Sequence, residues 1–125
     1  MKQKILILAS LMLLLVGTMN CYGFCIYNRT DIATIDADQI SGGGWFTSFW
    51  QKIDKGDKKC CGWNDHGCNT EGKRDSIVEF IISSPNKKVT IPGGKKSNRI
   101  CKKSIKAYQD IIVTGSNGNY QCIAR

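Results

Sequence analysis

The chain has 125 residues, of which 18 are Lys or Arg, 10 are Asp or Glu, seven are Cys and 13 are Gly. This length allows one domain, and the composition excludes a collagen, a coiled coil and a low-complexity disordered chain. The formal net charge of +8 favours an acidic partner over a basic one.

Residues 1–23 have the pattern of a secretory signal peptide, because two lysines precede the apolar run from Ile5 to Val16. That run is too short for a bilayer, which needs roughly 20 apolar residues, and no later stretch is apolar enough to form a transmembrane segment. We therefore expect cleavage after Gly23, with cleavage after Asn20 as the alternative. Residues 24–125 are then expected to form a single secreted, soluble and monomeric domain.

Cleavage after Gly23 removes Cys21 and leaves an even number of cysteines, as a fully disulfide-bonded domain requires. Adjacent side chains on a strand point to opposite faces of the sheet. Cys60 and Cys61 are therefore expected to have two different partners, one reached through the core and one toward an edge or loop. The remaining pairing stays open. The expected disulfide cysteines are Cys25, Cys60, Cys61, Cys68, Cys101 and Cys122.

From Phe24 onward the chain contains 14 Ile and three Val, but no Leu and no Met. β-Branched side chains suit a pleated sheet better than a helix. Strong helix formers are scarce, with four Ala and two Glu in the same stretch. The sequence therefore predicts an all-β fold, a small disulfide-stapled β-sandwich of about seven short strands.

The expected strands follow one another with turn signals between them, and the strand at 76–82, apolar on both faces, is expected to be central. The segment 45–53 is ambiguous, because its apolar residues also fall on one face of a helix, so a strand and a short helix both remain open. The strands are expected at 24–27, 32–40, 49–53, 58–63, 76–82, 88–91, 105–113 and 120–124.

Two segments are candidates for binding. Trp45–Trp50 contains four aromatic residues, which either fill the core or form a platform for sugars or a membrane interface through Trp45 and Trp50. The stretch 86–106 contains eight cations and no acid, and it is either a solubilising face or a patch for an anionic ligand. The cations expected to bind that ligand are Lys95, Lys96, Arg99, Lys102 and Lys103.

One modification site is expected, because Asn28-Arg29-Thr30 is a glycosylation sequon at Asn28. We expect no enzyme and no cofactor, since His66 is the only histidine and no nucleophile motif such as G-x-S-x-G occurs. We also expect no metal site. Cysteines cluster around His66, but the adjacent Cys60 and Cys61 cannot easily reach one zinc ion together.

The stretches Lys55–Asn64, Cys68-Asn69 and Gly72–Phe80, with the opening Phe24–Asn28, resemble small secreted cysteine-rich proteins of filamentous and plant-associated fungi. Ile26-Tyr27-Asn28 is also similar to the opening of thaumatin-like and cytolysin-like sandwiches. The first resemblance implies an effector-like protein that binds at a host or competitor cell surface. Its partner would be an anionic glycan, a lipid head group or a surface protein, and nucleic acid is not the expected partner. The alternative is a membrane-active toxin that uses the aromatic segment and the basic segment together.

Overall fold

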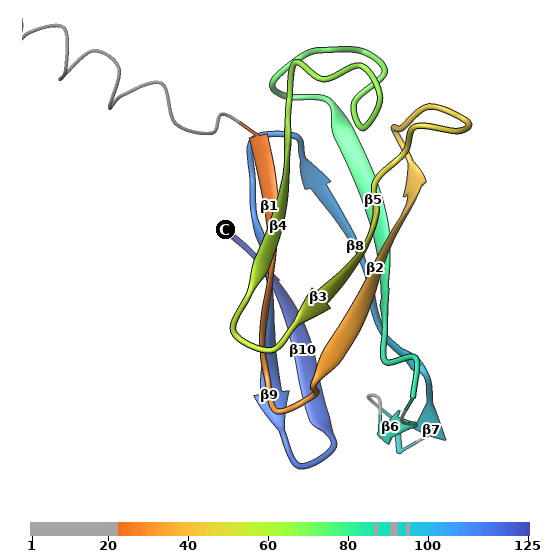
Figure 1. Ribbon diagram of the computed structural model, residues 1–125, viewed down its shortest axis with the longest axis vertical. Coiled ribbons are helices and arrows are strands. Elements are labelled where there is room, and N and C mark those ends of the chain that lie inside the picture. Colours follow the sequence, from red (N-terminus) through yellow and green to blue (C-terminus); the bar gives the residue numbers. More distant parts are fainter. Residues whose placement is uncertain (1–22, 87, 91–92, 95) are drawn as a thin grey trace, which may run out of the picture.

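The computed structural model describes residues 23–86, 88–90, 93–94 and 96–125. The predicted signal peptide up to Tyr22, and Lys87 and Lys95 of the basic segment, lie outside the described residues. The described residues form strands, turns and irregular segments, so the prediction of an all-β fold is correct (Figure 1). In this part of the chain, no helix is long and apolar enough to cross a membrane.

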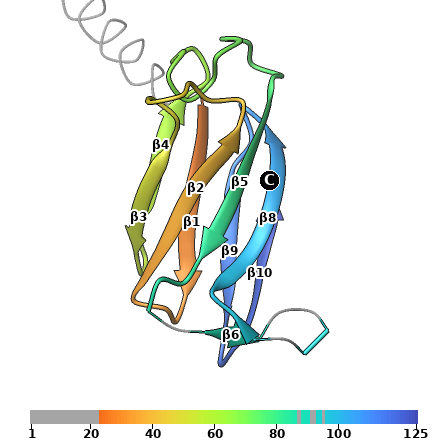
Figure 2. The ribbon, with the colours of Figure 1, turned by 90° about the vertical axis from the view of Figure 1, so that its right-hand side faces the viewer.

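Two sheets pack face to face as a sandwich (Figures 1 and 2). Sheet A has the strand order β4-β1-β9-β10-β6-β7, and sheet B has the order β3-β2-β5-β8. The strands of sheet A are β1 Gly23–Thr30, β4 Lys58–Gly62, β6 Val89–Thr90, β7 Lys96–Ser97, β9 Ile111–Ser116 and β10 Asn119–Ala124. The strands of sheet B are β2 Thr34–Ser41, β3 Trp50–Asp54, β5 Ile77–Ser83 and β8 Arg99–Lys106.

The core lies between the sheets and follows the alternation of the strands. In β5, Val78, Phe80 and Ile82 point inward and are fully buried. The Phe80 ring contacts those of Phe24 in β1 and Phe49 next to β3 in edge-to-face geometry, with centroids 4.9 and 5.8 Å away. This contact joins the two sheets, and the interior position of β5 in sheet B confirms the prediction of a central strand.

The six cysteines of the described residues form three disulfides, Cys25–Cys60, Cys61–Cys68 and Cys101–Cys122. The adjacent Cys60 and Cys61 do have different partners. Neither bond crosses the core, however, because Cys60 bonds to Cys25 on the neighbouring strand and Cys61 bonds to a loop. The sheets are instead joined by Cys101 in β8 and Cys122 in β10. Three disulfides are compatible with an extracellular protein.

The boundaries of several strands differ from those predicted. The expected strand at 105–113 is two strands, since β8 ends at Lys106, the chain turns at 107–110 and β9 begins at Ile111. The segment 45–53 contains no helix, because residues 45–47 form a turn and β3 starts at Trp50. The basic segment contains the edge strand β8, in which Lys102 and Lys106 are exposed, whereas Lys103 is half-buried and shares the inner face with Ile105.

The side chain of Asn28 is fully buried between the sheets. Its Nδ2 donates hydrogen bonds to the carbonyl oxygens of Ile32 and Ile53, at 3.1 and 3.0 Å. Its Oδ1 accepts from the backbone N and the hydroxyl of Thr30, at 3.2 and 2.6 Å. Because a glycan would be attached to this same nitrogen and would need a path to solvent, the fold leaves no room for the glycan expected at Asn28.

Tyr120 gives the fold a dependence on high pH. Its hydroxyl donates a hydrogen bond to Asp31, and burial, followed by this hydrogen bond, raises the pKa of Tyr120 above its usual value. A raised pKa stabilises the folded state below the pKa of the unfolded chain, and this stability is lost as the pH rises through the folded pKa.

We therefore expect the free energy of unfolding to fall above about pH 10, and to fall less in Tyr120→Phe, which has no ionisable hydroxyl. Urea titrations of both proteins between pH 8 and pH 11 measure the difference. If the free energy of unfolding fell equally with pH in the two proteins, Tyr120 would not contribute to the pH dependence.

Candidate functional site

Most of the exposed large apolar side chains among the described residues lie at one end of the sandwich, in its loops and in the strand residues next to them. This end, here called the aromatic end, consists of the loops 42–49, 63–76 and 107–110 with the strand residues next to them (Figure 1). The sheet pairing brings these loops together, since Ser41 pairs with Glu79, and Ile77 pairs with Lys106. The exposed large apolar residues at this end are Ile40, Trp45, Phe46, Trp50, Ile77 and Tyr108.

Trp45 and Phe46 protrude at the tip of the 42–49 loop. Their side chains are 89% and 93% exposed, and their ring centroids lie 6.2 Å apart. Trp50 follows at the start of β3 and is 67% exposed, whereas Phe49 points into the core. Of the four aromatic residues of this segment, only Phe49 is therefore part of the core, as the first interpretation expected for all four. The segment leaves Trp45, Phe46 and Trp50 available to a partner.

The loop that carries Trp45 and Phe46 is held by the neighbouring loop 63–76. The backbone N of Gly44 donates to the carbonyl of Gly67 at 2.8 Å, and the hydroxyl of Thr47 donates to the same carbonyl at 3.3 Å. The backbone N of Thr70 donates to the carbonyl of Gly42 at 2.9 Å. These bonds give the exposed rings a defined position before any partner binds, which lowers the entropic cost of binding.

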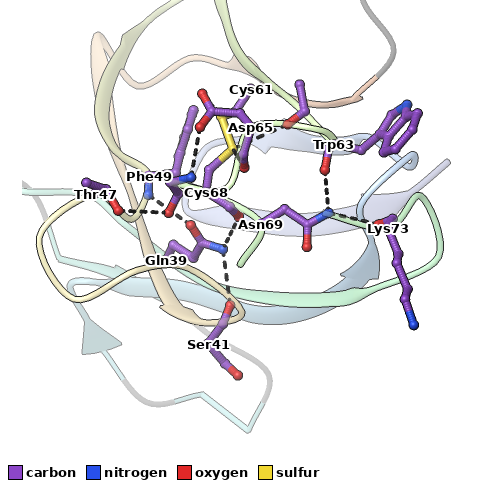
Figure 3. Close-up of a disulfide and its surroundings, with 12 residues drawn as sticks. Gln39, Ser41, Thr47, Phe49, Cys61, Trp63, Asp65, Cys68, Asn69 and Lys73 are labelled. Atoms are coloured by element: carbon purple, nitrogen blue, oxygen red, sulfur yellow. Dashed lines mark hydrogen bonds between the residues drawn. A yellow bond between two sulfur atoms is a disulfide. The ribbon is translucent and has the colours of Figure 1, made fainter. Parts of the chain in front are cut away.

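A buried glutamine at the base of the loop completes this support (Figure 3). Gln39 in β2 donates from Nε2 to the carbonyl of Cys68 at 2.7 Å, and its Oε1 accepts from the backbone N of Phe49 at 2.9 Å. One side chain thus connects β2, the aromatic loop and the cysteine loop. Gly43 packs against it so closely that a Cβ there would lie 2.5 Å from Oε1, which explains why this position lacks a side chain.

The loop 63–76 is in turn held by the Cys61–Cys68 disulfide and by Asn69 (Figure 3). Asn69 is buried and donates from Nδ2 to the carbonyls of Trp63 and Lys73, at 2.6 and 2.8 Å. The sulfur atoms of Cys61 and Cys68 lie close to the carboxylate of Asp65. Because these sulfurs are bonded to each other they are not thiolates, and this cluster offers no thiolate ligand for a metal ion.

His66 lies in the same loop, exposed to solvent. Its Nδ1 is 3.2 Å from the carbonyl oxygen of Thr70, and its ring packs over Gly72. Gly72 has a φ of 66°, and a Cβ there would come within 2.4 Å of the imidazole. The contacts of His66 are therefore with its own loop. Such local contacts are typical of a turn that is rich in Asn, Asp and Gly.

The cations of the basic segment do not form one surface. Lys96 and Arg99 lie at the end opposite the aromatic end, near β6 and β7 (Figures 1 and 2). Lys102 lies on the outer face of sheet B, where its Nζ is 3.7 Å from Glu79. Lys103, the next residue of β8, pairs with Phe80 and points to the other face. The expected grouping of Lys96, Arg99, Lys102 and Lys103 is therefore not found among the described residues.

The arrangement also separates the aromatic segment from most of the basic segment. The eight residues of β8 extend over roughly 25 Å, so Arg99 and Lys106 lie at opposite ends of the sandwich. The aromatic loop itself contains no charged residue between Gly42 and Phe49. Trp45 and Phe46 therefore lie at one end of the sandwich, and Lys96 and Arg99 lie at the other.

No protein-family model, no curated protein and no solved structure matches this chain. The fold is that of a small all-β domain stapled by disulfides, and its function has to be inferred from the geometry of the aromatic end. Three apolar residues of this end, Ile40, Ile77 and Tyr108, were not expected as site residues. The sequence contains no signal for them, because only the pairing of β2, β5 and β8 places them at the same end of the sandwich.

Proposed function

We propose that this protein is a secreted binding protein that docks on the lipid surface of another cell through its aromatic end. The proposal rests on the nearly complete exposure of Trp45 and Phe46, on a loop that is held in place by hydrogen bonds to the loop 63–76. Exposing two large apolar side chains to water is unfavourable, and each gains roughly 1.5 to 3 kcal/mol when it is buried. Tryptophan and phenylalanine also suit the boundary between head groups and acyl chains.

The shape and charge of the loop favour a membrane over other partners. The two rings protrude at a tip with their planes 75° apart, as in a wedge that enters an interface, whereas a sugar platform would present its rings side by side in one plane. Because the loop is uncharged from Gly42 to Phe49, its binding does not require anionic lipid. We therefore propose peripheral docking on a largely neutral bilayer, driven by burial of apolar surface.

Replacing both rings is expected to abolish vesicle binding without affecting the fold. Trp45→Ala/Phe46→Ala should lower the partition coefficient on phosphatidylcholine vesicles by at least about 100-fold, because roughly 3 kcal/mol or more of apolar burial is lost. Both side chains are exposed, so the thermal unfolding of the variant should match that of the wild type. Co-sedimentation with vesicles measures the partition coefficient.

Ile123→Ala is the matched control, since Ile123 is a partly exposed apolar residue on the outer face of sheet A. This variant should bind vesicles as the wild type does, and binding by both should change little between low and high salt. The proposal would be contradicted if the wild-type protein bound no vesicles, or if the double variant bound them as tightly as the wild type does. Release of a trapped dye, measured in the same vesicles, separates docking from the membrane damage expected of a toxin.

A further inference from the structure

A second surface lies on the outer face of sheet A, where three cations surround one tyrosine ring. The guanidinium carbon of Arg29 is 5.1 Å from the ring centroid of Tyr27, and that of Arg125 is 6.0 Å from it. The Nζ of Lys58 is 5.5 Å from the same centroid. We call these four residues the Tyr27 cluster.

Three separate parts of the chain build the Tyr27 cluster. Tyr27 and Arg29 are two residues apart in β1 and therefore share a face of the sheet. Lys58 is the partner of Tyr27 in the β1–β4 pairing, and Arg125 directly follows β10. Because these cations are far apart in the sequence, no run of basic residues marks the cluster.

The charges of the cluster are only partly compensated. The three cations lie within 6.0 Å of one centroid, so no two of them are more than about 12 Å apart, close to the Debye length of about 10 Å at 0.1 M salt. One acid pairs with the cluster among the described residues, Asp110, whose carboxylate is 3.9 Å from Arg125. The face of an aromatic ring attracts cations more weakly than a full negative charge does. An anion placed between Arg29 and Lys58 would therefore lower the mutual repulsion.

We propose that the Tyr27 cluster binds the sulfate or carboxylate groups of an acidic polysaccharide. Two of its cations are arginines, whose planar fork matches such oxyanions. Tyr27 is half-buried and fixed in a strand, so the cations gather around a rigid centre. Nucleic acid fits less well, because the ring that would stack on a base already has cations around it.

Anionic lipid also fits the Tyr27 cluster less well than a polysaccharide. The side chains that would enter a bilayer, Trp45 and Phe46, lie on the 42–49 loop and not on the outer face of sheet A. The proposal is independent of docking through the aromatic end and has the opposite physical signature. Binding at the Tyr27 cluster should weaken with salt, whereas binding at the aromatic end should not.

The test compares two variants that lose the same charge. Arg29→Gln/Lys58→Gln/Arg125→Gln removes the cations of the cluster. The control Lys88→Gln/Arg99→Gln/Lys102→Gln removes three exposed cations of the basic segment. Affinity for heparin is measured by calorimetry at several salt concentrations, with polygalacturonate, duplex DNA and phosphatidylserine vesicles as further probes.

The cluster variant is expected to bind heparin at least about tenfold more weakly, and the slope of log K against log salt should become shallower by roughly 2 to 3. The control variant should lose little affinity. Arg29→Gln/Lys58→Gln leaves the contact between Arg125 and Asp110 intact, so it tests the site even if the triple variant unfolds.

If the cluster and control variants lost the same affinity for heparin, the loss would be explained by overall charge alone, and the proposal would be overturned. A larger loss in the control, or no heparin binding by the wild type, would also overturn it. Tighter binding to DNA or to phosphatidylserine vesicles than to either polysaccharide would assign the cluster to a different ligand and contradict the proposal.

Discussion

Reduction of the three disulfides is expected to unfold the protein at room temperature. The bonds close loops with sequence separations of 35, 21 and 7 residues. In the chain-entropy treatment these loops contribute roughly 4, 3 and 2 kcal/mol, respectively. Small domains are typically stable by only about 5 to 15 kcal/mol, so the loss of all three bonds removes most or all of the stability. Circular dichroism with and without a reductant measures the change.

The bonds can also be ranked one at a time. Cys25→Ser/Cys60→Ser and Cys101→Ser/Cys122→Ser should each lower the free energy of unfolding more than Cys61→Ser/Cys68→Ser does, because their loops are longer. The last variant should mainly loosen the loop 63–76 and, through it, the aromatic loop. A reduced protein that keeps its β-sheet spectrum would show that the isoleucine-rich core alone is sufficient.

Replacing Asn28 by alanine is expected to lower the free energy of unfolding by at least about 3 kcal/mol. The substitution leaves the carbonyls of Ile32 and Ile53 and the backbone N of Thr30 without their partner, and each unsatisfied buried group costs roughly 1 to 3 kcal/mol. The matched control is Asn119→Ala on the exposed face of β10, which should change stability by no more than about 0.5 kcal/mol. Chemical denaturation measures both values.

The same residue offers a second readout. Protein secreted from eukaryotic cells should carry no glycan on Asn28, because Nδ2 is buried and already donates two hydrogen bonds. The intact mass should therefore be the same before and after enzymatic removal of N-glycans. A glycosylated Asn28 in folded protein, or an Asn28→Ala variant as stable as the control, would contradict the buried position.

The fold class could be predicted because it rests on composition. A chain whose apolar volume is almost entirely isoleucine, valine and aromatic residues has few ways to form a helical core. The same reasoning could not separate β8 from β9. The sequence from Ile105 to Val113 has no Gly or Pro to mark the turn that the structure places at Ala107–Asp110.

The candidate sites were harder to predict, for two physical reasons. Local sequence showed that Trp45 and Trp50 were candidates, but the exposure of Trp50 depends on its pairing with Asp38 on the outer face of sheet B, and the position of the loop that carries Trp45 depends on hydrogen bonds to the distant loop 63–76. Local sequence also grouped Lys102 with Lys103, although neighbouring residues of a strand point to opposite faces. The Tyr27 cluster could not be predicted from a local sequence pattern, because its residues come from three distant parts of the chain.

The parallel pairing of β1 with β9 has a consequence for how the chain acquires its structure. Ile26 in β1 pairs with Ile111 in β9, so these two neighbouring strands of sheet A meet only when most of the chain is available. Contacts between such distant residues give a high contact order, which slows folding. The entropic cost of closing a long loop comes before the stabilisation that the strand pairing contributes. Until then one edge of β1 stays open to other chains, and a polypeptide with such an open edge is prone to aggregate.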